Sequence, residues 1–236
     1  MPDPISAVKN SIQQDLIHLN AVSQNLANAN TQGYRSIETI SQPFADMAKN
    51  SDAAGPHTGM ITLVRHDAGE LSNTGRSLDL AITGKSFFSI QTPEGPRLSR
   101  TGSFQLDKDG RLVNLQGLSV LGEGGEIFLD STAVRIDSSG KIYQNDKLVD
   151  QLALVELSDP KQLYYIGAGL YTSPLEFQKT PESVSVKQGF LEMSNVNPSN
   201  EMVKLIQIQR HVESVQKALK TYGQMMDSGI NNIGQR

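Results

Sequence analysis

Two short stretches of the sequence hold residue types that could bind a phosphate or a metal ion. The first, Thr83-Gly84-Lys85-Ser86, resembles the end of a phosphate-binding loop. That loop needs a further glycine five residues before Gly84, so that the chain turns around the phosphates, but Asp79 stands there. The residues that follow, Phe87-Phe88-Ser89-Ile90, favour a strand over the helix that a phosphate loop requires. We therefore expect no nucleotide site.

The second stretch, Asp107-Lys108-Asp109-Gly110, is similar to the start of a calcium-binding loop. A calcium loop closes with a glutamate at its twelfth position, and Leu118 stands there. An Asp at the start of a turn and a Gly at its end are instead typical of a hairpin, because Gly accepts a positive φ. We predict a turn between two strands at this point.

The histidines give no pattern for a metal site, and cysteine is absent. His18 and His211 lie in the two end segments, and His57 and His66 lie near a connector. No two of them have the spacing of metal ligands on one helix. A Gly-x-Ser-x-Gly elbow is also missing. We expect no catalytic residue, cofactor or metal, and an enzyme that uses paired carboxylates has no sequence support, although composition does not exclude it.

Charge and hydropathy argue against two further classes of function. The formal net charge is −4 and no short stretch is rich in Lys and Arg, so we expect no nucleic-acid binding. No run approaches the roughly 18 apolar residues that span a membrane. The first residues lack a basic leader, so we expect no cleavable secretory signal. The apolar share of 37% is low and predicts a modest core in an extended or multi-part molecule.

Both ends of the chain carry apolar residues at alternating steps of three and four, the heptad pattern of helices that pair. The C-terminal set is Leu205, Ile208, Val212, Val215, Leu219, Tyr222 and Met226. The N-terminal set is Ile5, Val8, Ile12, Leu19, Val22 and Leu26. Asp15 alone breaks the second set. We expect one helix from Asp3-Pro4 to about Ala27, and another capped by Asn197 with Pro198 at its first position.

Stripes as narrow as these are not stable on single helices in water, so each needs a partner. Two arrangements fit the spacing. The helices could form an intramolecular hairpin that closes an ordinary domain, or both could pack into neighbouring copies in an assembly. Spacing alone leaves both open.

Between about residues 60 and 193 the apolar period changes to two, with turn residues between short segments. We predict an α+β fold: N- and C-terminal α-helices that pair as a coiled-coil domain, with an inserted, mainly antiparallel β domain. Residues 1–35 and 196–236 form the discontinuous helical domain in this prediction. Residues 36–73 form an extended connector, and residues 74–195 form the β-rich domain.

Three amide side chains, Asn25, Asn28 and Asn30, mark the end of the first helix pattern. Asn side chains bond to nearby backbone groups and compete with helix continuation, and Gly33 permits a sharp exit. A polar helix end explains the glycine. Three such residues would also suit hydrogen bonds to a neighbouring subunit.

This block, Asn25-Leu26-Ala27-Asn28-Ala29-Asn30-Thr31-Gln32-Gly33-Tyr34, resembles the N-terminal signature of flagellar basal-body rod and hook proteins. Three further blocks follow in the family's order: Thr74-Gly75-Arg76-Ser77-Leu78-Asp79-Leu80-Ala81-Ile82 with Phe87-Phe88, Arg100-Thr101-Gly102-Ser103-Phe104, and Gln188-Gly189-Phe190-Leu191-Glu192-Met193-Ser194-Asn195-Val196-Asn197. The sequence departs from the family at Ser86, where glycine is common, and at Leu98, where an aromatic is common. The four blocks cover the whole length, and on them the chain is identified as a member of this family.

The resemblance implies a structural subunit of the rod, the drive shaft that carries torque from motor to hook in the periplasm. It implies export by the flagellar type III apparatus, and other proximal and distal rod subunits as partners, without membrane insertion. The short chain, with no aromatic before Tyr34, is more similar to proximal-rod members than to distal-rod or hook members. A coiled-coil homo-oligomeric stalk or adhesin would also explain the heptads, but not the four blocks.

The resemblance also implies that the terminal helices pack as coiled coils around a central channel, with the β domain outside. We accordingly expect subunit interfaces at the apolar seams and the amide block. These residues are Val8, Ile12, Leu19, Val22, Asn25, Leu26, Asn28, Asn30, Leu205, Ile208, Val212, Val215, Leu219, Tyr222 and Met226.

Overall fold

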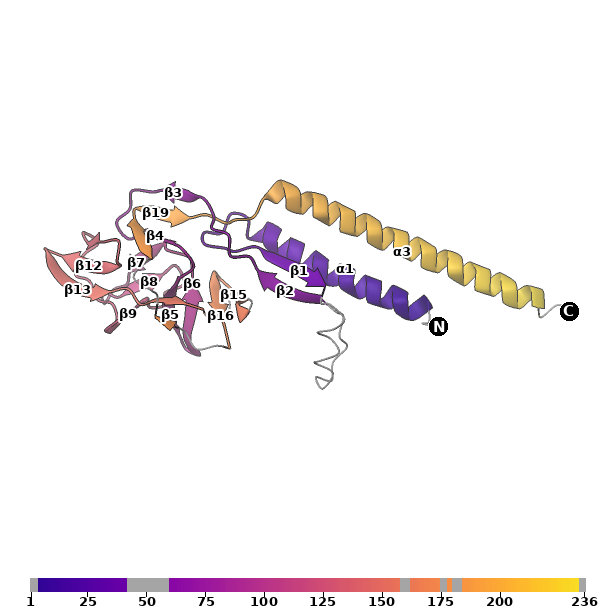
Figure 1. The fold of residues 1–236 in the computed structure, drawn as a ribbon, viewed down its shortest axis with the longest axis horizontal. Helices are drawn as coiled ribbons and strands as arrows, with labels where there is room; N and C mark the ends of the chain where they lie inside the picture. Colours follow the sequence, from indigo (N-terminus) through magenta and orange to yellow (C-terminus); the bar gives the residue numbers. More distant parts are fainter. Residues whose placement is uncertain (1–3, 42–59, 158–161, 175–177, 180–183, 234–236) are drawn as a thin grey trace. The chain divides into compact units, whose positions relative to one another are not determined.

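Two long helices lie near the ends of the chain in a computed structural model of the protein (Figure 1). The structure describes residues 4–41, 60–157, 162–174, 178–179 and 184–233. Helix α1 spans Pro4–Ala27 and helix α3 spans Pro198–Ile233. At a rise of 1.5 Å per residue they are about 36 Å and about 54 Å long.

The fold between them is built from short strands, which the structure gives as follows. They are β1 (Ile37–Ser41), β2 (Met60–Val64), β3 (Leu71–Asn73), β4 (Leu80–Thr83), β5 (Phe87–Thr92), β6 (Gly95–Ser99), β7 (Phe104–Leu106), β8 (Leu112–Asn114), β9 (Leu121–Gly122), β10 (Gly125–Glu126), β11 (Arg135–Ile136), β12 (Lys141–Gln144), β13 (Lys147–Gln151), β14 (Leu154–Glu156), β15 (Tyr164–Gly167), β16 (Leu170–Thr172), β17 (Gln178–Lys179), β18 (Ser185–Gln188) and β19 (Phe190–Glu192).

The largest sheet has six strands in the order β15-β16-β6-β5-β14-β17. Smaller ladders join β11-β12-β13, β4 with β18, β3 with β19, β7 with β8, β9 with β10, and β1 with β2. The strand pairs with assigned registers are antiparallel. The predicted α+β class and the antiparallel character of the strands are thus confirmed.

The chain divides into two units by its internal contacts. The helical unit comprises Met1–Leu26, Thr39–Thr62 and Asn197–Arg236. The β-rich unit comprises Ala27–Glu38 and Leu63–Val196.

The segment predicted as an extended connector, residues 36–73, contains the strands β1, β2 and β3. Strand β3 pairs with β19 just before α3, with Leu191 opposite Ser72. The part of the predicted connector from residue 42 to residue 59 lies outside the described residues.

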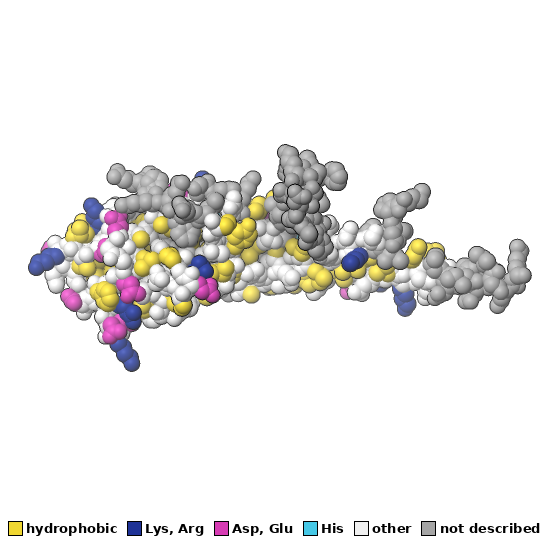
Figure 2. Space-filling model, turned by 90° about the horizontal axis from the view of Figure 1, so that it is seen from below, with side chains coloured by type: hydrophobic (Ala, Val, Ile, Leu, Met, Phe, Trp, Pro, Cys, Tyr) yellow, Lys and Arg dark blue, Asp and Glu magenta, His cyan; other side chains and the backbone are white. Residues whose placement is uncertain are grey.

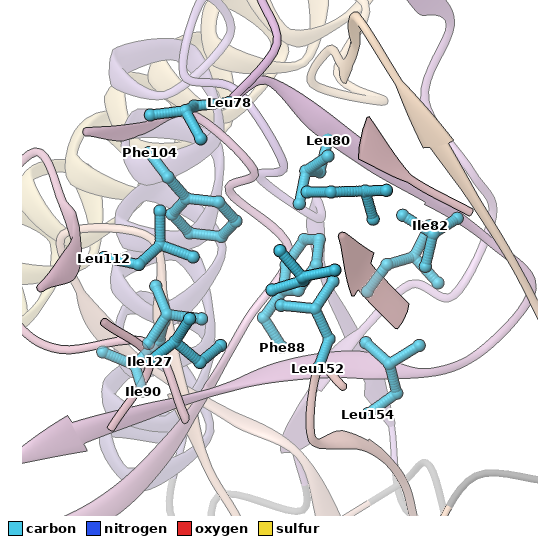
Figure 3. Packing of buried hydrophobic residues seen from close by; sticks show 14 of the residues in the cluster. Leu78, Leu80, Ile82, Phe88, Ile90, Phe104, Leu112, Ile127, Leu152 and Leu154 are labelled. Carbon is cyan, nitrogen blue, oxygen red and sulfur yellow. The ribbon is translucent and has the colours of Figure 1, made fainter. Parts of the chain in front are cut away.

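The main core of the β-rich unit is an apolar cluster, part of which Figure 3 shows. Phe88 and Phe104 meet edge to face at its centre, with ring centroids 5.1 Å apart. Strands β4, β5, β7 and β8 all contribute side chains to this cluster. A second cluster packs around Phe87, Leu98 and Tyr171. The β-rich unit therefore has an apolar core of its own, although several large apolar side chains, Leu115, Phe128 and Leu148 among them, remain exposed on its surface.

The predicted hairpin at Asp107 is confirmed, since β7 pairs with β8 across it. The Oδ1 atom of Asp107 accepts hydrogen bonds from the backbone N–H groups of Asp109 and Arg111, at 2.9 and 2.8 Å. Gly110 has a φ of 79°, in the left-handed region that favours glycine. The acidic side chain therefore closes the turn. Thr83-Gly84-Lys85-Ser86 likewise leads from β4 into β5, a strand, as expected.

Candidate assembly surface

The heptad residues form the least exposed stripe of α3. Leu205, Ile208, Val212, Val215 and Leu219 are half-buried, whereas the residues between them are exposed. On α1, Val22 is buried, and Val8, Ile12, Leu19 and Leu26 are half-buried. Each helix thus turns its predicted apolar stripe away from solvent.

Two polar contacts join the stripes of α1 and α3 inside the helical unit. The Nδ1 atom of His211 lies 2.8 Å from Oδ2 of Asp15. The amide Nδ2 of Asn25 donates to Oε2 of Glu201 at 3.2 Å. Asp15 and Asn25 are ten residues apart (25 − 15), and so are Glu201 and His211 (211 − 201), but in the opposite order along the chain. The helices therefore run antiparallel (Figure 1).

This register brings the two heptad patterns into step. Read backward from Leu26 to Val8, the stripe of α1 advances by four, three, four, three and four residues. Read forward from Glu201 to Leu219, the stripe of α3 advances by the same steps. Asp15, which breaks the apolar pattern of α1, falls in this series at the level of Val212, next to its partner His211.

The polar residues in the stripe are compensated, as buried carboxylates must be. Glu201 is buried, and its Oε1 also accepts a hydrogen bond from Nζ of Lys204 at 2.6 Å. Asp15 is buried, while the ring of His211 is largely exposed. Neither His18 nor His211 was predicted at a site. His18 also has a partner, because its Nδ1 contacts the hydroxyl of Thr39.

The start of α3 is fixed by a side-chain cap. Oδ1 of Asn197 accepts from the N–H of Asn200 at 3.1 Å, and its carbonyl accepts from the N–H of Glu201 at 3.1 Å. Pro198 occupies the first helical position, where its missing N–H costs nothing. The predicted cap is confirmed, and it places Glu201 in the first turn, opposite Asn25.

The amide block has partners within its own chain. Oδ1 of Asn28 accepts from the hydroxyls of Thr31, at 3.2 Å, and Tyr165, at 3.4 Å. Asn30 is exposed, and Tyr222 is exposed on α3. Met226 lies in α3, but its side chain is outside the described residues. Of the three amides predicted at an interface, the structure leaves Asn30 on the surface.

Sequence reasoning missed an apolar group on the outer side of α3. Met202, Val203 and Ile206 are 51%, 53% and 49% exposed. At 100° per residue they point about 100° to 160° away from the stripe that faces α1. We call these three residues the outer patch. Apolar side chains are visible on the molecular surface in Figure 2. The available signal was three large apolar residues outside the heptad steps.

A second feature lies in the β-rich unit, where three of the four sequence blocks meet. Arg35 follows the first block, Arg100 opens the third, and Glu192 belongs to the fourth. We call these three residues the junction cluster. Nη2 of Arg35 lies 2.7 Å from Oε1 of Glu192, and Nη1 of Arg100 lies 3.6 Å from Oε2 of Glu192. All three side chains are at most 2% exposed.

Two observations bear on other classes of site. Among the described residues, no three His, Cys, Asp or Glu side chains are grouped as a metal site would need. In the same part of the chain, neither helix is apolar enough over a sufficient length to cross a membrane.

Three family models match successive parts of the chain. Residues 11–35 match "Flagella basal body rod protein", residues 81–144 match "Flagellar hook protein FlgE/F/G D1 domain", and residues 187–233 match "Flagellar basal body rod FlgEFG protein C-terminal". The matches contain the amide block, strands β5 to β12 and the whole of α3.

Individual relatives cover nearly the whole chain. The flagellar basal-body rod protein FlgF of Mesorhizobium japonicum is 31% identical over 229 residues, with 92% of each chain covered. FlgF of Rhizobium meliloti is 34% identical, with 92% of this chain and 91% of the relative covered. FlgG of Buchnera aphidicola from Acyrthosiphon pisum is 31% identical, with 92% and 95% covered. These comparisons give no support to a stalk or adhesin, and the chain belongs to the family of flagellar basal-body rod proteins.

Proposed function

We propose that this chain is a structural subunit of the bacterial flagellar basal-body rod, and that it assembles with other rod subunits through its terminal helices. Similarity to FlgF and FlgG over nine-tenths of the chain supports this role. The protein acts in the basal body as a drive shaft, in the periplasm, and carries torque rather than catalysing a reaction. It is exported by the flagellar type III apparatus.

The outer patch carries the assembly part of this proposal. Met202, Val203 and Ile206 lie together within two turns, on the side of α3 that turns away from α1. Exposing large apolar side chains to water is unfavourable, and covering them with another surface lowers the free energy. Leu16 of α1 is 52% exposed and adds further apolar surface in contact with water. A neighbouring subunit would bury these side chains.

The matched stripes of α1 and α3 supply the other part. We propose that the two helices pair as an antiparallel coiled coil within each subunit, so that residues 1–35 and 196–236 act as one discontinuous domain. Residues 36–73 then connect it to a β-rich domain of residues 74–195. The hydrogen bonds of Asp15 with His211 and of Asn25 with Glu201 support this pairing. The outer surfaces of the pair are then free to contact other rod subunits.

Similarity to FlgF favours a proximal position along the rod. A distal position is the second candidate, because FlgG relatives match over a similar share of the chain.

The test replaces two residues of the outer patch and measures rod assembly in cells. We expect Val203→Ser/Ile206→Ser to fold, because both side chains are already half exposed. The variant should fail to restore rods and swimming in a strain that lacks this protein. A matched control, Gln207→Ser/Gln209→Ser, changes two exposed polar residues on the same turns and should restore both.

Rods and swimming at normal levels in the patch variant would contradict the proposed interface. Sedimentation of the purified chain separates the stalk alternative: a stable oligomer of fixed stoichiometry would favour a stalk, whereas a monomer that joins basal bodies supports the rod.

A further inference from the structure

The junction cluster buries three charges where an apolar core would be expected. Glu192 lies between two guanidinium groups and also accepts a hydrogen bond from the N–H of Gly69 at 3.0 Å. Arg35 donates to the carbonyl of His66. Arg100 donates to the carbonyls of Ile82, at 3.0 Å, and Gly84. The cluster therefore bonds to the backbone of several segments.

The three charged residues come from three distant parts of the chain. Arg35 stands eight residues after the end of α1 at Ala27 (35 − 27). Glu192 stands six residues before the start of α3 at Pro198 (198 − 192). Arg100 follows β6 and belongs to the body of the β-rich unit. One cluster thus contains the segment that leaves α1, the segment that leads to α3, and the β core.

The backbone around the cluster joins the same two segments directly. The N–H of Gly33 donates to the carbonyl of Glu192 at 2.7 Å. The N–H of Ser36 donates to Oδ1 of Asn195 at 2.7 Å. Gly33 has a φ of 67°, and a Cβ there would lie 2.4 Å from the carbonyl carbon of Arg100. The chain crosses the cluster too closely for any side chain at position 33.

The hydroxyl of Tyr171 also binds the backbone of the segment that follows α1. It accepts from the N–H of Arg35 at 2.8 Å and donates to the carbonyl of Gly33 at 3.4 Å. Burial raises the pKa of Tyr171 above its usual range, so the hydroxyl stays protonated and keeps both bonds at neutral pH.

Such a cluster is costly for stability alone. Removing charges from water is unfavourable, and well-packed apolar residues often replace a buried ion group without loss. Burial lowers the pKa of Arg100 to about 10, although Glu192 opposes this shift, so the guanidinium stays charged at neutral pH. What the charged groups add is direction, because their hydrogen bonds to backbone N–H and carbonyl groups fix both distance and angle.

We infer that the junction cluster is a mechanical joint: force that reaches the β-rich unit from either helix is taken up by the buried ion pairs of Glu192 with Arg35 and Arg100 and by the hydrogen bonds of these side chains to the backbone. The inference concerns the single chain and holds whether or not the rod assignment does. If the chain is a rod subunit, torque that passes along the chain from either helix into the β-rich unit would load this joint.

Single-molecule pulling on the full chain tests this inference. The sequence has no cysteine, so introduced cysteines give unique attachment points. One pair, Lys9→Cys with Gln105→Cys, pulls between α1 and β7. The other, Gln216→Cys with Gln105→Cys, pulls between α3 and β7. All three positions are exposed.

Glu192→Gln should open the β-rich unit about tenfold faster or more at a fixed force, because one partner of a buried ion pair loses its charge. The acceleration should appear in both pulling directions. Arg111→Gln is the control, since it removes the partly exposed pair with Asp107 and should change neither rate. An effect in one direction only, or in neither, would overturn the inference.

Arg35→Lys covers the case in which Glu192→Gln does not fold. It keeps the positive charge but loses the forked geometry of the guanidinium. The opening rate should again rise in both directions, by a smaller factor. Unchanged hydrogen-exchange protection in β4 and β5 would verify that the core is folded, and an unchanged rate in that folded variant would count against the joint.

Discussion

The two units of this protein treat their apolar residues in opposite ways. In the β-rich unit, Phe88, Ile90 and Phe104 have at most 1% of their surface in water. In α3, none of the described apolar side chains is fully buried, and in α1 only Ala21 and Val22 are. Hydrophobic burial is the main favourable term in folding. The difference indicates that the β-rich unit has a core of its own, whereas the helical unit buries few apolar side chains within itself.

The largest expected effect is that of a cavity in the core of the β-rich unit. It tests whether this core is the main source of stability. Phe104→Ala removes a ring that packs against Phe88 and leaves a cavity among rigid strands. We expect a loss of about 3–5 kcal/mol in the free energy of unfolding, measured by denaturant titration. A loss below about 1 kcal/mol would show that the core is not the source of stability.

A charge placed in the apolar stripe of α3 tests how much the helical unit relies on that stripe. Leu219→Asp places a carboxylate among half-buried apolar residues and should destabilise the helical unit by about 1–3 kcal/mol. Amide hydrogen exchange should quicken in α1 and α3 and stay unchanged in β4 and β5. Rod assembly should fail as well.

Ser214→Asp is the matched control for the stripe, because it adds the same charge at an exposed position of α3. Equal hydrogen exchange in the two variants, or normal rods formed by Leu219→Asp, would show that the apolar stripe is not needed for helix stability or for assembly.

Loss of the amide at position 28 should have a smaller effect, confined to the β-rich unit. Asn28→Ala deprives the hydroxyls of Thr31 and Tyr165 of their shared acceptor. We expect a cost of about 1 kcal/mol, seen as faster exchange near residues 31–34. If rod assembly fails while this exchange is unchanged, Asn28 acts on a neighbouring subunit, as the sequence pattern suggested.

The smallest expected effect concerns pH and the hairpin at Asp107. Backbone hydrogen bonds from Arg111, above all, hold the pKa of Asp107 below its ordinary value of 3.8. A lowered pKa in the folded state means that the carboxylate stabilises the fold above pH 3.8 and loses this contribution as the pH falls through the lowered pKa.

Asp107→Asn should therefore be slightly less stable than the native chain at neutral pH and equal to it once Asp107 is protonated. Thermal unfolding of both proteins across this pH range measures the difference. A gap that persists in acid would point to the shape of the amide rather than to the charge.

Local patterns in the sequence predicted the parts of the fold that local physics determines. The three-four spacing and the Pro4 and Pro198 positions locate the helices, which span Pro4–Ala27 and Pro198–Ile233. The Asp-to-Gly turn predicted the β7–β8 hairpin. In each case the signal lies within a few residues of the structure that it determines.

Contacts between distant residues could not be predicted in this way. Arg35 and Glu192 are 157 positions apart (192 − 35), and nothing in their local sequence names the other as partner. His211 carried no spacing signal, because its partner Asp15 lies on the opposite helix. The heptad pattern does not predict the outer patch, because Met202, Val203 and Ile206 lie outside its steps.

The equal steps of the α1 and α3 stripes limit how this protein can change in length. One residue inserted into either helix turns every later side chain by about 100° and takes it out of line with the opposite stripe. Seven residues added to both helices together keep the two series aligned. Loops between strands carry no such constraint. Insertions and deletions should accordingly be tolerated mainly in the connections between strands. The helices should tolerate them only as seven residues added to or removed from both helices together.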